Sequence, residues 1–359
     1  MKLLHASDFH LDAPFAALSP EKAALRRAEG RGLLTRLASL ARAEQADLVL
    51  LAGDLFDGEQ VYRETLTALT QALASIPVPV LIAPGNHDPF TPRSPYAVLP
   101  WPENVTIFTS ETMASKPFPH LNCVVHGLGF TRDRVEEDLL EGFCAPEDGR
   151  LHIGIIHGDV CQGTSFYNPM SQKSILESGL DYLALGHIHA PSGLQKLGRT
   201  YYAYPGCPEG HGFDELGDRG CLIVDVEKGG VSARFRSLAQ RRYLELQADL
   251  SDSDPLAAAE AALSRVSPGD CVKLIFTGER DQAPDLAFLE PRLEGRVFAL
   301  RLRDRTRLKS GTWDKAGEDT LTGAFLRLMR EKADGGQANA ELAARFGLAA
   351  LEKGEDCRP

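Results

Sequence analysis

Short apolar segments alternate with helical segments through the first 230 residues, and this alternation is the feature that most constrains the fold. We expect strands at 2–7, 47–52, 79–83, 104–109, 122–126, 151–156 and 182–185. The segments 21–44 and 62–75 have the apolar spacing of amphipathic helices. The uninterrupted apolar run at 47–52 is typical of a strand buried on both faces. Short strands that alternate with helices indicate a layered α/β fold.

The pattern changes towards the C-terminus. Residues 219–226 and 231–236 flank a glycine-containing turn and predict a hairpin. Beyond it we expect strands at 243–248, 271–277 and 297–303, with helices at 254–266 and 285–293. Asp254 has the side chain of an N-cap residue and precedes Pro255. Two further amphipathic helices are expected at 320–332 and 339–352. We therefore predict a main domain at 1–240, a small domain at 241–305 and a helical tail at 306–359.

The composition is that of a globular protein, with 43% hydrophobic and 25% charged residues. No apolar run approaches the roughly 18–20 residues of a membrane-spanning helix, and the N-terminal apolar stretch is too short for a signal peptide. The seven cysteines are odd in number and include no Cys-x-x-Cys pair, which argues against a disulfide framework or a zinc ribbon. We expect a cytoplasmic protein that does not bind membranes.

Residue types that bind metals follow five of the expected strands, as the carboxyl ends of strands in α/β sheets commonly form sites. They are Asp8 and His10; Asp54 and Asp57; Asn86, His87 and Asp88; His157; and His187 and His189. Alternate side chains of an extended segment share a face, so Asp8 and His10 can bind one ion together. The mixture of carboxylates, imidazoles and an amide suits manganese, iron or zinc. Two ions about 3.5–4 Å apart need a bridging carboxylate. Asp54 lies in the middle of this set of residues, so we expect it to be the bridge.

These motifs resemble a known family. Asp-x-His, Gly-Asp-x-x-Asp, Gly-Asn-His-Asp, His-Gly and Gly-His-x-His, in this order, resemble the calcineurin-like metallophosphoesterases. The segments HASDFHLDAPF, LLAGDLFD, PGNHDP, LDYLALGHIH and YAYPGCPEGHGFDELGDRGC resemble the SbcD-type DNA repair exonucleases and, among them, the YhaO branch. The resemblance implies a four-layer sandwich of mixed sheets flanked by helices, with a small α+β cap domain and a helical C-terminal tail.

The resemblance also implies roles for individual residues. One divalent ion would be bound by Asp8, His10, Asp54 and His189, and the other by Asp54, Asn86, His157 and His187. Manganese is expected, with iron and zinc as alternatives. A metal-bound hydroxide would attack the phosphodiester. His87 would be the general acid or would position the phosphate, and a hydrogen bond to Asp57 would orient it.

The function implied is that of a nuclease subunit in double-strand break repair, an exonuclease, and the sequence leaves open whether it is also an endonuclease. Its partners would be the ends of duplex or single-stranded DNA and an SbcC-like SMC-type ATPase. Because its relatives form homodimers, a homodimer is a further candidate assembly. The net charge of −11 argues against this, because nucleic-acid binders usually carry a basic face. A phosphodiesterase or phosphatase for small molecules such as cyclic nucleotides is one alternative, although about 120 extra residues favour the nuclease. A weakly active scaffold for the ATPase is another.

Some residues keep two interpretations. Asp88 either supports the ligands or caps a turn. The histidines outside the motifs are interpreted as surface or packed residues; they are His5, His120, His126, His152 and His211. The glycine-rich loop that carries His211 could nevertheless approach the site. Cys161 and Cys207 are expected to be small buried residues.

Two surface patterns also remain open. A basic side chain stands at every second position, at Arg301, Arg303, Arg305, Arg307 and Lys309. On a strand this row would either protect an exposed edge against aggregation or contact phosphates or an acidic partner. In the tail, apolar residues recur at helical spacing, at Leu321, Phe325, Leu328 and Met329. They would either pack against the same chain or dock to the ATPase.

Overall fold

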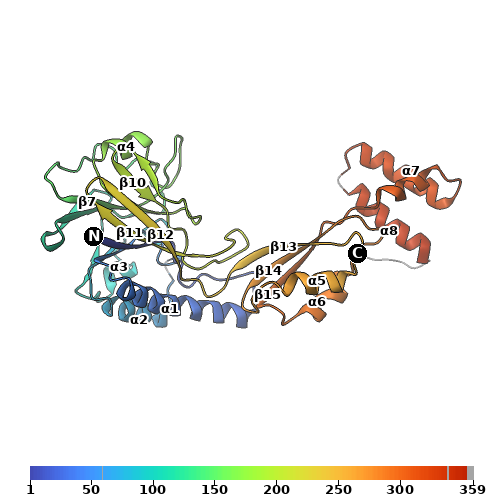
Figure 1. Cartoon of the computed structure of the whole chain (residues 1–359), viewed down its shortest axis with the longest axis horizontal. Helices are drawn as coiled ribbons and strands as arrows, with labels where there is room; N and C mark the ends of the chain where they lie inside the picture. The colour runs from blue at the N-terminus through green and yellow to red at the C-terminus, as the bar shows by residue number, and fades with distance from the viewer. Residues whose placement is uncertain (59, 338, 354–359) are drawn as a thin grey trace. The chain divides into compact units, whose positions relative to one another are not determined.

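The computed structural model describes residues 1–58, 60–337 and 339–353 (Figure 1). The chain divides into two units, Met1–Arg242 and Tyr243–Pro359, so the first division lies beside the predicted boundary at 240. The separate boundary at 305 stays a prediction. The predicted tail includes residues 338 and 354–359, and with them Cys357, which lie outside the described residues.

The first unit contains two six-stranded sheets. In the first sheet the strand order is β12-β11-β1-β2-β3-β4. The strands are β1 (Lys2–Ala6), β2 (Leu48–Leu51), β3 (Val80–Ile82), β4 (Val105–Ile107), β11 (Gly220–Glu227) and β12 (Gly230–Ser237). Strands β1 to β4 are parallel, whereas β11 pairs antiparallel with both β1 and β12. The predicted hairpin is therefore the pair β11 and β12.

The second sheet has the order β5-β6-β7-β8-β10-β9. Its strands are β5 (Ala114–Phe118), β6 (Cys123–Gly127), β7 (Leu151–His157), β8 (Tyr182–Gly186), β9 (Gln195–Leu197) and β10 (Thr200–Ala203). The inner strands are parallel, and the edge strands β5 and β9 pair antiparallel. All of the parallel strands of one sheet consequently end at a common edge, where loops can carry a site.

Alternate residues of β1 point into different cores. Leu3 belongs to the apolar cluster that includes Val125 and Ile155 of the second sheet, so this core lies between the sheets. Leu4 belongs to the cluster that includes Leu37 and Leu69 of two helices. These are α1 (Pro20–Ala43) and α2 (Arg63–Ala74), and the outer face of the second sheet packs with α4 (Gln172–Glu177). The layers helix, sheet, sheet and helix confirm the predicted sandwich.

Helix α1 begins where its sequence predicts a start. The Ser19 hydroxyl accepts a hydrogen bond from the Lys22 N–H at 3.4 Å, and Pro20 occupies the first turn. Its apolar face, which includes Leu33, Leu34 and Leu37, is buried in the helix–sheet core. The two short remaining helical elements of this unit are α3 (Pro95–Val98) and the 3-10 turn η1 (Pro119–Leu121).

The second unit begins with a three-stranded parallel sheet in the order β13-β14-β15. The strands are β13 (Tyr243–Asp249), β14 (Cys271–Thr277) and β15 (Ala299–Asp304), and the helices packed with them are α5 (Pro255–Leu263) and α6 (Leu286–Leu293). Asp254 caps α5 as predicted, accepting hydrogen bonds from the N–H groups of Leu256 and Ala257, each at 3.0 Å. A second small core joins η2 (Ser310–Gly317), α7 (Leu321–Asp334) and α8 (Ala340–Lys353). No helix within the described part of the chain is long and apolar enough to span a membrane.

A buried histidine links the two sheets of the first unit. His5 of β1 is fully buried, and its Nδ1 lies 2.8 Å from the Tyr182 hydroxyl of β8. Its Nε2–H donates to the carbonyl of Leu185 at 3.0 Å. Burial lowers the pKa of His5 to about 3, and the bond to Leu185 opposes this only in part. The packed interpretation of His5 is confirmed.

We predict that His5 makes the fold sensitive to acid. The unfolded chain binds a proton at this residue below about pH 6.5, whereas the folded chain does not, so stability is lost as the pH falls below 6.5. Between about pH 6.5 and 5 the loss from one such group is about 2 kcal/mol. Urea unfolding in EDTA should show a weaker pH dependence for His5→Gln than for the wild type.

The exposed His120 provides the control. His120→Gln should retain the full pH dependence of the wild type. An equal pH dependence in His5→Gln and the wild type would contradict the prediction.

Candidate metal centre

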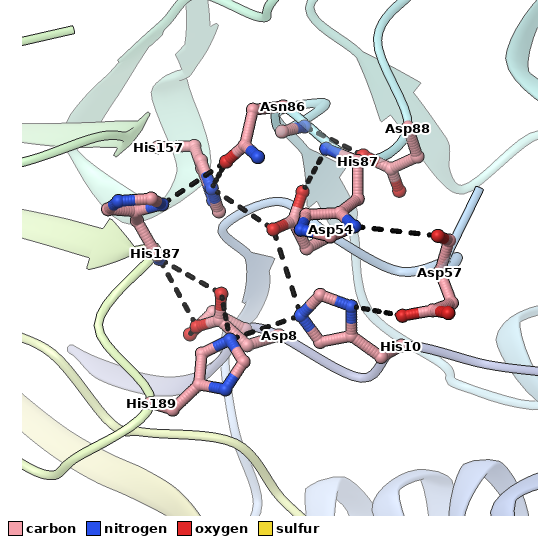
Figure 2. Close-up of polar contacts among 12 residues, drawn as sticks. Asp8, His10, Asp54, Asp57, Asn86, His87, Asp88, His157, His187 and His189 are labelled. Atoms are coloured by element: carbon pink, nitrogen blue, oxygen red, sulfur yellow. Dashed lines mark hydrogen bonds and ion pairs between the residues drawn. The ribbon is translucent and has the colours of Figure 1, made fainter. Parts of the chain in front are cut away.

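The seven predicted metal ligands meet at the carboxyl ends of strands from both sheets of the first unit (Figure 2). Asp8 and His10 follow β1, Asp54 follows β2 and Asn86 follows β3. From the second sheet, His157 ends β7, and His187 and His189 follow β8. The packing of the two sheets against each other therefore builds the centre, because neither sheet carries the whole set.

The first predicted ligand group is assembled around His10. Its Nε2 lies 3.1 Å from Nε2 of His189 and 3.8 Å from Oδ2 of Asp54. Nε2 of His189 is 4.0 Å from Oδ1 of Asp8. Donor atoms of Asp8, His10 and His189 all lie within 4.8 Å of one another. These distances are short enough for the atoms to surround one ion.

The second predicted group is assembled around His157. Its Nε2 lies 3.3 Å from Oδ2 of Asp54 and 3.0 Å from Oδ1 of Asn86. Nδ1 of His187 lies 3.1 Å from the same Asn86 oxygen. Asp54 Oδ2 thus faces both groups, which is the position of a bridging carboxylate.

The backbone is strained at these residues. Positive φ angles occur at Asp8 (56°), His10 (43°), Asp54 (51°) and His187 (107°). Residues other than glycine rarely adopt this region, and such strain persists only where the surrounding structure enforces it. Four of the seven predicted ligands therefore have a backbone that is set by the site and not by local preference.

Gly85 allows Asp54 to occupy its central place. A Cβ atom at position 85 would lie 2.1 Å from Oδ1 and 2.7 Å from the main-chain N of Asp54. The same Oδ1 accepts a hydrogen bond from the His87 N–H at 2.9 Å. The loop after β3 can pack against Asp54 only because residue 85 has no side chain.

The carboxylates create a field that favours positive charge. Burial alone would lower the pKa of His10, but its hydrogen bond to Asp57 and the charges of Asp54 and Asp8 outweigh burial and raise it to about 9. For His157 burial is likewise outweighed by Asp54, and the pKa rises to about 9. Burial would raise the pKa of Asp54, but His157 and His10 hold it well below its usual range. An ionised, buried and bridging carboxylate among imidazoles fits divalent cations.

The structure corrects the predicted partner of Asp57. Its Oδ1 lies 3.0 Å from Nδ1 of His10, whereas His87 Nδ1 contacts the main-chain carbonyl of Asp57 at 3.4 Å (Figure 2). No hydrogen bond or ion pair joins the side chains of Asp57 and His87 among the described residues. The reason is the pairing of the loops after β1 and β2, in which the Asp57 N–H donates to the Leu11 carbonyl and brings the carboxylate to the His10 ring.

Asp88 caps the turn that carries Asn86 and His87. Its Oδ1 accepts a hydrogen bond from the Gly85 N–H at 2.8 Å, and its Oδ2 accepts from the Phe56 N–H at 3.1 Å and from the Tyr96 hydroxyl at 2.6 Å. Burial, followed by the charge of Asp54, raises the pKa of Asp88 to about 7. Of the two open interpretations, the structure shows the turn cap.

Two carboxylates at the site were not predicted. Glu215 contacts Nδ1 of His189, and Asp159 Oδ1 lies 3.6 Å from Nε2 of His187. Asp159 follows His157 by two residues, the same spacing as Asp8 and His10, and this pattern could have identified it. Glu215 lies 26 positions after His189, so no local spacing connects the two.

The remaining predicted residues lie as follows. The ring of His211 is 5.7 Å from that of His10, so its loop does approach the site. His126 and His152 are buried, and His120 is exposed. Cys207 is fully buried, but Cys161 is only partly buried because it lies in the loop after β7, so that expectation was wrong. All six described cysteines are free thiols.

Comparison with known proteins identifies the family. The model of the calcineurin-like phosphoesterases matches residues 1–191, more than half of the chain. The chain belongs to this family. Its members are hydrolases that use divalent metal ions, and the seven predicted ligand positions of this calcineurin-like phosphoesterase lie within the matched residues.

Three relatives of this calcineurin-like phosphoesterase match most of the chain. The SbcD component of the nuclease SbcCD of Rhodobacter capsulatus is 35% identical over 326 residues, covering 75% of this chain and 77% of that protein. The uncharacterized metallophosphoesterase YhaO of Bacillus subtilis is 29% identical over 299 residues, covering 77% and 72%. The DNA double-strand break repair protein Mre11 of Methanopyrus kandleri is 25% identical over 332 residues, covering 85% and 71%. The predicted resemblance is confirmed.

We predict that Gly85→Ala removes metal binding. The added methyl group would displace Asp54, and both ligand groups share that carboxylate. The number of Mn²⁺ ions per chain, measured by inductively coupled plasma mass spectrometry after dialysis, should fall from about two to less than one.

Gly58→Ala is the matched control, because nothing lies within 4 Å of a Cβ atom at that position. This variant should bind as much Mn²⁺ as the wild type. Full Mn²⁺ occupancy in Gly85→Ala would show that Asp54 is not the shared ligand.

Proposed function

We propose that this calcineurin-like phosphoesterase is a manganese-dependent DNA nuclease that cleaves phosphodiesters at DNA ends. The observation that carries the proposal is that Asp54 Oδ2 faces both predicted ligand groups, with His10 at 3.8 Å on one side and His157 at 3.3 Å on the other. The names of two relatives, the SbcD component of the nuclease SbcCD and the DNA double-strand break repair protein Mre11, support DNA as the substrate.

The side chains divide the chemical work. Two bound ions would supply Lewis acidity, activating water and stabilising charge on the phosphate. Asp54 would hold both ions in a fixed relation, and Asp8 and His157, which are fully buried, would keep the inner side of the centre free of bulk water. Asp57 would orient His10 through Nδ1.

His87 would protonate the leaving oxygen. Its main-chain N–H is fixed to Asp54, and its ring lies 4.7 Å from that of His10, edge to face. Its side chain is exposed, unlike those of the buried ligands. With Nδ1 directed at the Asp57 carbonyl, Nε2 is the atom that would deliver the proton.

A basic row in the second unit would supply the positive field that the net charge of −11 lacks. β15 is an edge strand, and the row continues beyond it because the N–H of Arg305 donates to the carbonyl of Phe276 in β14 and the N–H of Arg307 donates to that of Gly278 just after it. Arg301, Arg303, Arg305 and Arg307 are all exposed and make no ion pair among the described residues, whereas the alternate Leu302 and Leu308 are buried. Unpaired arginines at strand spacing fit a row of phosphates.

The tail would contact an SMC-type ATPase. Leu326 and Met329 of α7 pack with Ala344 and Leu348 of α8, so this face is used within the chain. Leu321 and Leu328 are 73% and 50% exposed. These two leucines of the predicted apolar pattern would therefore be available to contact a partner. Packing within the chain therefore accounts for Met329, and docking to the ATPase stays a proposal for Leu321 and Leu328.

We predict the following for the purified protein with Mn²⁺. End-labelled linear duplex DNA should be degraded, and Asp54→Ala should abolish this activity.

His87→Ala should bind Mn²⁺ as the wild type does but hydrolyse DNA roughly 100-fold or more slowly, because a general acid contributes about that factor. His120→Ala, which changes another exposed histidine, should behave as the wild type does.

Loss of Mn²⁺ from His87→Ala would place His87 among the ligands and contradict its role as an acid. Stable DNA in a sample that hydrolyses bis-(p-nitrophenyl) phosphate or a cyclic nucleotide would contradict the nuclease and favour a small-molecule phosphodiesterase.

We also predict that the basic row contributes to DNA affinity. Arg303→Ala/Arg305→Ala should reduce the slope of log affinity against log salt by about two, and should leave hydrolysis of bis-(p-nitrophenyl) phosphate unchanged. Arg330→Ala, which alters an exposed arginine of α7, should keep the wild-type slope. Equal salt slopes in the wild type, the double variant and Arg330→Ala would contradict the prediction. The row would then serve only to protect the sheet edge against aggregation.

A further inference from the structure

The loop that follows β10 holds His189 from two sides. Glu215 contacts the ring at Nδ1, and Arg219 Nη1 donates to the main-chain carbonyl of His189. The Cys207 N–H donates to the same carbonyl at 3.2 Å. These contacts fix both the backbone and the ring, although the side chain of His189 is 37% exposed. An exposed ligand needs such restraint more than a buried one does.

Glu215 is itself held in place. It is 5% exposed, and its Oε2 accepts a hydrogen bond from the His211 N–H at 2.6 Å and lies 3.2 Å from His211 Nδ1. Its main-chain carbonyl accepts from Arg219 Nε at 3.3 Å. The two carboxylate oxygens thus have different partners, with Oε1 for His189 and Oε2 for His211.

The loop is anchored to the body of the first unit. Glu209 Oε1 lies 2.9 Å from Nη1 of the buried Arg26 of α1, and its Oε2 lies 3.3 Å from Nη2 of Arg36. The ring of His211 stacks on Phe15 at 5.5 Å. Supporting residues that are themselves fixed can hold a ligand within the narrow geometry that metal binding requires.

Engagement of Nδ1 determines which nitrogen of His189 faces the centre. With Nδ1–H donating to Glu215, Nε2 carries the lone pair, and this is the atom that lies 3.1 Å from His10 Nε2. The equivalent outer atom of His157 is Nδ1, which lies 2.9 Å from the Ala52 carbonyl. A carboxylate partner differs from a carbonyl because it also raises the basicity of the ligating nitrogen.

We propose that Glu215 is the positioning residue for His189, and that it sets the affinity of the ion bound by Asp8, His10, Asp54 and His189 without contacting that ion. The inference rests on the proposed two-metal centre. It assigns Glu215 to one of the two ions only, because the partners of the other group, Ala52 for His157 and Asp159 for His187, lie elsewhere.

The test is Mn²⁺ titration by calorimetry of the whole chain, with Glu215→Gln as the variant. Gln keeps the shape of the side chain but removes its charge and one acceptor oxygen. Wild-type protein should bind two ions, and in Glu215→Gln one of them should bind about 10- to 100-fold more weakly. At limiting Mn²⁺, the electron paramagnetic resonance signal should change from that of a coupled pair to that of a single ion.

Asp214→Asn is the matched control, because Asp214 is the exposed neighbour in the same loop. It should bind both ions as the wild type does. Wild-type affinity for both ions in Glu215→Gln would overturn the inference, and a lower melting temperature of that variant in EDTA with unchanged Mn²⁺ binding would overturn it too. Absence of Mn²⁺ binding by the wild type would instead overturn the proposed centre, so the two failures are distinguishable.

A second variant covers the case in which Glu215→Gln does not fold. His211→Ala removes the contact of the His211 ring with Oε2 but keeps the Glu215 carboxylate and the main-chain N–H of residue 211. A several-fold weaker affinity for the same single ion supports the inference. Unchanged affinity for both ions in a folded His211→Ala protein contradicts it.

Discussion

The carboxylate of Asp54 is the interaction on which the rest of the centre depends. It is 1% exposed, and its Oδ2 faces His10 from one sheet and His157 from the other. Its Oδ1 holds the loop that carries His87. A buried charge is costly unless it is paired, so this residue requires cations or protonated imidazoles on both sides. The raised pKa values of His10 and His157 express the same requirement, which two divalent ions would satisfy.

The packing of the two sheets against each other brings together the groups that surround Asp54. The core between the sheets brings the ends of β1 and β2 against those of β7 and β8, and the His5–Tyr182 contact joins β1 to β8 inside it. The strained backbone at Asp8 and Asp54 would relax in an isolated loop, so the packing of the strands must supply the energy that holds it. Stability of the core and geometry of the centre are therefore coupled through the same strands.

Local patterns made the ligand motifs and most of the parallel strands predictable, although β10, which pairs parallel with β8, was missed. Expected strands such as 47–52 and 182–185 match β2 and β8 because buried strands are continuous apolar runs, and Asp254 caps its helix because capping is local. Strand β5 was missed, since four of its five residues are exposed and its sequence has no apolar period. The partner of Asp57 and the role of Glu215 depend on contacts between distant loops, and the 26 residues from His189 to Glu215 carry no period that could reveal them.

Exposure within the centre indicates the side from which a substrate enters. Asp8 and His157 are fully buried, whereas His87 is exposed and His189 is 37% exposed. In the proposed reaction a phosphodiester would therefore approach along the side lined by these two histidines, with its leaving oxygen towards His87. On this side the ligand that is most accessible to water and substrate is also the one that Glu215 and Arg219 restrain. The restraint allows the open side to admit a phosphate without letting the ligand turn away, and this is the condition for a centre that is both accessible and ordered.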